Sequence, residues 1–135
     1  MATVQTPISA ATPDAPAASP NVLDQLSAWN VLIPDRADVL RYLAKYPGTG
    51  DVLPAMSAEA RRAFGPSVEL SLEVYHDRET VDEYLALYVR KDRYEPGFID
   101  EVCANNRKFD DVLENATGFL QLTSDYRRPR GQHAV

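Results

Sequence analysis

The sequence predicts an α+β domain, in which a three-stranded, mainly antiparallel sheet carries helices on one of its faces. Residues 68–75 alternate apolar and polar side chains, which is typical of a half-buried strand, and residues 83–90 repeat this alternation after an acidic loop. Residues 118–124 alternate in the same way and predict a third strand. Segments with helical periodicity precede the first two strands and separate them from the third.

The register of the first two strands decides which side chains enter the core. In residues 68–75 the aliphatic positions fall on one side of the strand. In the second strand we expect Leu85, Leu87 and Val89 to face the helices, because the alternative register would bury tyrosine hydroxyls that each need a partner. A helix connects the second strand to the last one, so the last strand can join the sheet at either edge of this pair. The first strand is a candidate for the centre of the sheet.

Two or three helices are expected before the sheet, the first of them being a short turn. Residues 22–29 place apolar side chains at helical spacing and end at Trp29. The second helix begins at Pro34, has two aspartates in its first turns and stops at Pro47. The third, residues 51–64, begins with an aspartate as N-cap and ends at a glycine.

The longest predicted helix begins at Pro96 and ends at Asn115. Apolar residues recur within it at steps of three and four, and two acidic residues lie near its start, where the helix dipole is positive. Cys103 falls on the predicted apolar side, where a buried cysteine acts as a small hydrophobic residue. We therefore expect no catalytic role for this thiol, since no histidine is near it in sequence.

The sequence predicts a single folded domain, residues 22–126, between two disordered tails. Residues 1–21 are mostly Ala, Thr, Ser and Pro with a single charged side chain, so they bury too little apolar surface to offset the entropy of ordering. Residues 127–135 form a short basic tail. No apolar run reaches the ~20 residues that span a bilayer, and one cysteine agrees with a reducing compartment. We expect a cytoplasmic protein that does not contact membranes.

The formal net charge is −6, and residues 67–123 hold 13 acidic against 6 basic side chains. Nucleic-acid binding usually requires Lys and Arg to neutralise phosphates, so a nucleic-acid partner is not expected. The only basic cluster of the predicted domain that lies beside tyrosines comprises Arg90, Lys91 and Arg93. It is the one segment whose composition would suit RNA.

A sheet that is covered on one side leaves a second face, which here combines tyrosines with carboxylates. Rigid aromatic side chains offer contact area at a small entropic cost, and carboxylates favour basic partners. The alternative is an ordinary solvated sheet face, on which tyrosine is a good strand former. Ser71, Gln121 and Thr123 are expected on the same face. The predicted interaction residues are Glu69, Glu73, Tyr75, Tyr84, Tyr88 and Arg90.

Motifs for catalysis and metal binding are weak in this chain. His76 and Asp77 form the His-Asp pair of HD-type phosphohydrolases, but that fold is helical and needs further ligands, and the other histidine is His133. The acidic residues that follow lack the oxygen spacing and the glycine of a calcium loop. The chain also contains no Gly-rich phosphate loop, nucleophile elbow or zinc-ligand spacing. We expect no cofactor and no bound metal.

The string L-E-V-Y-H-D-R-E-T-V-D-E-Y-L-A-L-Y-V-R and the later string G-F-L-Q-L-T-S-D-Y-R-R-P, with Tyr94 between them, carry a resemblance. Residues 67–129 resemble a group of small uncharacterised bacterial proteins. The most distinctive pieces are Asp-Glu-Tyr-Leu at the start of the second strand and Thr-Ser-Asp-Tyr-Arg after the third. The resemblance carries over no catalytic residue. It implies a protein that accompanies a neighbouring gene, as in a toxin–antitoxin pair.

The sequence therefore favours a small, non-enzymatic protein that binds another protein or a second copy of itself. The binding surface would be the open sheet face or a free strand edge. One alternative is an antitoxin-like protein that neutralises a co-encoded toxin. Another is a metal-dependent hydrolase that uses His76, Asp77 and the adjacent acidic residues.

Overall fold

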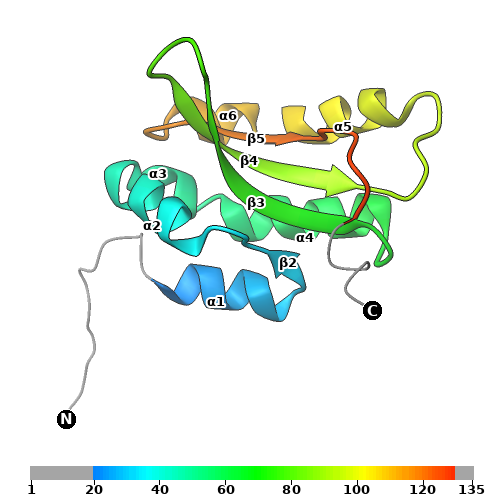
Figure 1. Ribbon diagram of the computed structural model, residues 1–135, viewed down its shortest axis with the longest axis horizontal. Coiled ribbons are helices and arrows are strands. Elements are labelled where there is room, and N and C mark those ends of the chain that lie inside the picture. Colours follow the sequence, from blue (N-terminus) through cyan, green and yellow to red (C-terminus); the bar gives the residue numbers. More distant parts are fainter. Residues whose placement is uncertain (1–19, 130–135) are drawn as a thin grey trace.

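The computed structural model describes residues 20–129, and in this range the protein has an α+β fold. Figure 1 shows α4 behind the strands β3 and β4, with α1 and α2 on the β2 side of the sheet and α5 and α6 on the β5 side. The elements in chain order are α1 (Pro20–Ala28), β2 (Val31–Leu32), α2 (Arg36–Lys45), α3 (Pro47–Gly50), α4 (Leu53–Phe64), β3 (Glu69–His76), β4 (Glu83–Arg90), α5 (Phe98–Arg107), α6 (Asp110–Glu114) and β5 (Leu120–Thr123).

Within residues 20–129 the sheet has four strands in the order β2-β3-β4-β5, so the predicted three-stranded sheet is wrong in its details. Only the central pair, β3 and β4, is antiparallel; β2 pairs with β3, and β5 with β4, in parallel. Strand β2 was not predicted because two residues are too few to show an alternation. The last strand joins β4, so β3 and β4 together form the centre of the sheet.

The helices cover one face of this sheet, and the predicted register is confirmed. Leu85, Leu87 and Val89 are buried with the aliphatic residues of β3. The tyrosines of β4 alternate with them and face away from the helices. The helices contribute to the same core Leu23, Leu26, Val39, Tyr42, Leu43, Leu53, Met56, Ala60, Phe98 and Val102.

Several helix ends differ from the prediction. Asp35 is the N-cap of α2, because its carboxylate accepts the backbone N–H of Asp38 at 3.1 Å, so the helix begins after Pro34. The next helix, α3, begins immediately at Pro47 and was not predicted. Asp51, the predicted N-cap of the third helix, is instead the C-cap of α3, and α4 has no side-chain cap. The predicted end of α4 at a glycine is confirmed.

The single long helix predicted for residues 96–115 is two helices, α5 and α6, separated at residues 108–109. Cys103 is exposed, so its predicted burial is wrong. Two apolar stripes lie next to each other on α5, and the helix packs through the one that contains Phe98 and Val102, which turns Cys103 outward. Of the predicted tails, residues 1–19 and 130–135 lie outside the described range, as does His133; α1 begins inside the predicted N-terminal tail.

Candidate functional site

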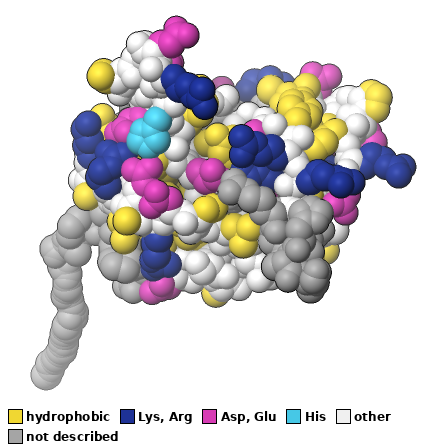
Figure 2. Space-filling model, in the orientation of Figure 1, with side chains coloured by type: hydrophobic (Ala, Val, Ile, Leu, Met, Phe, Trp, Pro, Cys, Tyr) yellow, Lys and Arg dark blue, Asp and Glu magenta, His cyan; other side chains and the backbone are white. Residues whose placement is uncertain are grey.

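The predicted interaction residues share the face of the sheet that is turned away from the helices. The antiparallel register of β3 and β4 places them opposite one another or at alternating positions of the two strands. The parallel register of β5 brings Gln121 and Thr123 to the same face, next to Ala86 and Tyr88. Figure 2 views this face, on which hydrophobic side chains lie among acidic and basic ones. We call it the open face.

Arg90 lies at one end of the open face and contacts three carboxylates. Its guanidinium donates to Glu69 at 3.1 Å, to Glu73 at 3.0 Å and to Asp125 at 2.8 Å. It also lies 5.1 Å from the centroid of the Tyr88 ring. Arg90 and Glu69 are buried, which the sequence did not predict, and Asp125 from the segment after β5 pairs with the Arg90 guanidinium. These residues hold the sheet end together and offer little surface to a partner.

The protonation states of this cluster follow from its contacts. Burial alone would lower the pKa of Arg90, but its hydrogen bonds to the three carboxylates outweigh burial and raise that pKa. Burial would raise the pKa of Asp125, yet the Arg90 guanidinium and the backbone N–H of Arg127 lower it overall. Burial, with the nearby Tyr84 and Glu73, raises the pKa of Tyr88 to about 12. At neutral pH the arginine is therefore charged and the tyrosine is neutral.

The other end of the open face carries three packed rings, Tyr75, Tyr84 and Phe119, which we call the aromatic patch. Tyr75 stacks on Tyr84 with centroids 4.9 Å apart, and Tyr84 meets the edge of Phe119 at 5.7 Å. Burial and the neighbouring Tyr75 raise the pKa of Tyr84, so its hydroxyl stays neutral. Tyr75 and Phe119 are exposed. The patch is therefore an accessible apolar surface whose rings already hold one another in place.

The backbone of Phe119 is anchored from α2. The Tyr42 hydroxyl accepts the backbone N–H of Phe119 at 2.9 Å and donates to its carbonyl at 3.2 Å. Gly118, immediately before it, has a φ of 76° and passes so close to Tyr46 that a Cβ would lie 2.6 Å from the tyrosine Cβ. The position of Phe119 thus depends on a close contact between α2 and the turn before β5.

Phe119 also borders a hollow between β5 and the α5–α6 region, with a volume of about 370 Å³. Two carboxylates of α6, Asp110 and Glu114, lie on its wall, and both side chains are exposed. We call this cavity the acidic hollow. It is lined by Asn106, Asp110, Leu113, Glu114, Phe119 and Leu120. The aromatic patch and the acidic hollow are contiguous because Phe119 belongs to both.

Phe119 and the α6 carboxylates were not predicted as site residues from the sequence. The alternation in the last strand carries a signal for Phe119, since it shares a face with Gln121 and Thr123. No local pattern places Asp110 or Glu114 next to that ring, because their position depends on the break between α5 and α6.

His76 does not form a dyad with Asp77. Its Nε2 lies 2.8 Å from Asp38 of α2 and its Nδ1 lies 3.4 Å from Glu83, while Arg41 bridges the same two carboxylates. Hydrogen bonds to Arg41 lower the pKa of Glu83. Asp77 instead accepts the backbone N–H of Glu79 within the hairpin loop. Across residues 20–129, no group of three or more His, Cys, Asp or Glu side chains is arranged to hold a metal ion.

The basic cluster and the two strand edges are the remaining candidate surfaces. Arg90 is buried among carboxylates and Lys91 pairs with Glu95 at 2.8 Å, so the predicted cluster is not a continuous basic surface. At the β5 edge, the N–H of Leu122 donates to the Asn106 side chain at 2.9 Å. The other edge is the two-residue strand β2. Neither edge offers a long row of free backbone groups for strand addition.

No protein-family model, curated protein or solved structure matches this chain. The resemblance noted for residues 67–129 therefore stays a prediction. Within the described range, no helix combines the length and the hydrophobicity needed to cross a bilayer.

Proposed function

We propose that this protein is a non-enzymatic binding module that holds a basic segment of another protein on its open face. The observation that carries the proposal is the continuity of the aromatic patch with the acidic hollow through Phe119. An exposed apolar anchor next to a carboxylate-lined cavity is the pairing that a Lys- or Arg-containing segment requires.

The contacts suggest how such a segment would bind. The aliphatic part of a Lys or Arg side chain would pack on Phe119 and Leu113, and its charged end would lie between Asp110 and Glu114. Neighbouring residues of the segment would pack on Tyr75 and Tyr84, whose rings can also accept a cation over their faces. Because the rings are already packed together, little side-chain entropy would be lost on binding.

The charge balance supports the same class of partner. Residues 67–123, which contain the open face and α6, hold 13 acidic against 6 basic side chains. Such an excess attracts basic proteins and raises their association rate at low salt. If the partner is a basic toxin encoded by a neighbouring gene, the module acts as an antitoxin, which is the specific form that the resemblance implies.

The first experiment is an affinity capture from the host with the tagged full chain, followed by identification of bound proteins by mass spectrometry. The test variant is Tyr75→Ala with Phe119→Ala. The control is Trp29→Ala, because Trp29 is 41% exposed and Tyr75 is 42% exposed, but Trp29 lies beside β2 and not on the open face. We expect a basic protein to be bound by the wild type and the control and lost from the double variant.

The affinity for the captured protein then tests the mechanism. Truncating an aromatic anchor costs about 2 kcal/mol or more, so the double variant should bind at least roughly 30-fold more weakly than the wild type. Asp110→Asn with Glu114→Gln should weaken binding and reduce its dependence on salt. The proposal is wrong if all variants bind equally. Sedimentation that shows only wild-type dimers, lost in the double variant, would identify a second copy of this chain as the partner instead.

A further inference from the structure

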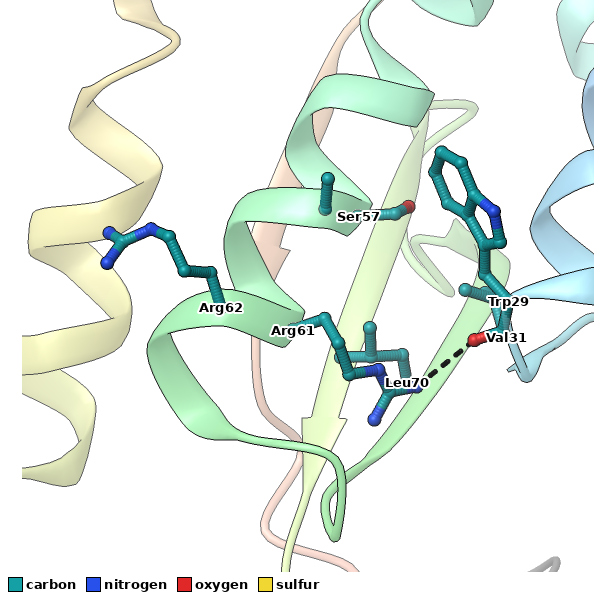
Figure 3. Close-up of a pocket in the computed structure, with 7 residues that line it drawn as sticks. Trp29, Val31, Ser57, Arg61, Arg62 and Leu70 are labelled. Atoms are coloured by element: carbon teal, nitrogen blue, oxygen red, sulfur yellow. Dashed lines mark hydrogen bonds between the residues drawn. The ribbon is translucent and has the colours of Figure 1, made fainter.

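Another cavity, of about 300 Å³, lies between α4 and β2, next to the turn that follows α1. Its lining is mainly apolar: Val31 of β2 and its sheet partner Leu70 of β3 form one wall, and the indole of Trp29 lies beside them. Figure 3 shows these side chains facing the last turns of α4. The cavity belongs to the helix-covered side of the sheet, so it is separate from the open face.

Ser57 brings an unpaired polar group to this cavity. Ser57 is 2% exposed, and its Oγ has no hydrogen-bond partner among residues 20–129. In Figure 3 the hydroxyl is directed toward Trp29. A buried hydroxyl without a partner is unfavourable and uncommon in folded proteins, so its persistence in a cavity wall points to a ligand that would satisfy it.

Arg61 lies one helical turn after Ser57 and therefore on the same side of α4. Its guanidinium contacts only backbone carbonyls: it donates to Val68 at 2.7 Å and makes longer contacts, from 3.4 to 3.5 Å, to four others. Within the described range no carboxylate pairs with it. Burial lowers the pKa of Arg61, and no acidic neighbour offsets this effect.

The adjacent arginine behaves differently. Arg62 borders the cavity, but in Figure 3 its side chain extends away from it, toward α5. There it forms an ion pair with Glu59. Of the two arginines at the end of α4, only Arg61 thus presents a cation without an acidic partner next to the apolar walls.

We propose that this cavity binds a small carboxylic acid with an apolar body. The Nη2 group of Arg61, whose contacts to the carbonyls of Trp29 and Asn30 are both 3.5 Å, can turn to a carboxylate oxygen, and the Ser57 hydroxyl can donate to the same carboxylate. The apolar body would lie against Trp29, Val31 and Leu70. A volume of about 300 Å³ is at the lower end for small-molecule sites, which favours acids of the size of phenylacetate or hexanoate.

Trp29 makes the proposal directly testable, because it is the only tryptophan of the chain. Its fluorescence is followed while the full chain is titrated with phenylacetate or hexanoate, and in parallel with the uncharged phenylacetamide and hexanamide. We expect a saturable change with the acids at dissociation constants of about 1 mM or tighter, the range open to ligands of this size. The amides should bind at least about tenfold more weakly, since they lack the charge that pairs with Arg61.

The matched variants are Arg61→Gln and Arg62→Gln, which remove the same charge from neighbouring positions of one helix. The first should weaken acid binding about tenfold or more, and the second should leave it unchanged. Ser57→Ala removes a hydroxyl that has no partner, so it should preserve the melting temperature and still weaken acid binding about threefold or more. This variant keeps the test decisive if Arg61→Gln fails to fold.

The proposal is overturned by any of three results. The first is the absence of a saturable change in Trp29 fluorescence with either acid. The second is equal binding of acids and amides, which would reveal an apolar groove without anion recognition. The third is equal loss of binding in Arg61→Gln and Arg62→Gln, which would reveal a general effect of charge.

Discussion

Replacing Arg90 with methionine tests the account of the carboxylate cluster. The substitution keeps a long apolar side chain but removes the guanidinium that contacts Glu69, Glu73 and Asp125. Removing one partner of a buried ion pair costs about 3–5 kcal/mol, because the remaining charges stay desolvated. Glu73 and Asp125 keep 25% and 22% of their side-chain surface exposed, so water can hydrate them in part. We therefore expect the free energy of unfolding to fall by about 3 kcal/mol at pH 7, which corresponds to a melting temperature lower by roughly 12 °C.

Arg41→Met is the matched control. Arg41 also contacts two carboxylates, Asp38 and Glu83, both at 2.9 Å, but 46% of its side chain is exposed, compared with 0% for Arg90. Exposed ion pairs are solvated and contribute about 1 kcal/mol or less. The difference between the two variants thus isolates the effect of burial, and urea unfolding followed by circular dichroism measures it.

The pH dependence adds a second criterion. The pKa of Asp125 is lowered from its ordinary value of 3.8 in the folded protein, so the stabilisation from this group is present above that pH and is lost as the pH falls below it. In Arg90→Met only Arg127 still opposes the effect of burial on Asp125, so we expect the pKa of this carboxyl to rise. Protonation of Asp125 should therefore remove from the variant a partly buried charge that has lost its Arg90 partner. The difference in free energy of unfolding between the wild type and the variant should shrink as the pH falls from about 7 to about 4. A loss of stability no larger than that of Arg41→Met, or a loss that does not change with pH, would show that Arg90 does not stabilise these carboxylates.

Three further tests address other parts of the structure. Gly118→Ala should lower the free energy of unfolding by at least about 3 kcal/mol, because a positive φ is combined with a clash against Tyr46. Gly65→Ala also meets a positive φ, but it has open space around it and should cost less, about 1–3 kcal/mol. Thermal melts that rank the two variants equally would contradict this. Tyr42→Phe removes both hydrogen bonds to the backbone of Phe119 and should lower the free energy of unfolding in urea by about 1–2 kcal/mol. An unchanged unfolding midpoint would show that the Tyr42 hydroxyl does not anchor Phe119. Cys103 should react fully with a thiol reagent in the native protein, and slow reaction would show that it is buried.

Local sequence patterns determined the α+β class, the β3–β4 pair and the orientation of its side chains. Alternation alone separated Leu85, Leu87 and Val89 from the tyrosines, since a strand presents successive side chains to opposite faces. The same alternation assigned the predicted interaction residues to one face, and the register of β3 and β4 agrees with that assignment. Such features could be predicted because they depend on neighbours within one element.

The accessibility of these residues, and the identity of the distant residues that join them, depend on how the elements pack together. Asp125 lies 35 residues from Arg90, and its position over the arginine follows from the pairing of β5 with β4. The acidic hollow depends on the break between α5 and α6, and the cavity of Ser57 and Arg61 depends on the parallel pairing of a two-residue strand. Periodicity carries no information about contacts between elements that are distant in sequence, because strand order and helix packing set them.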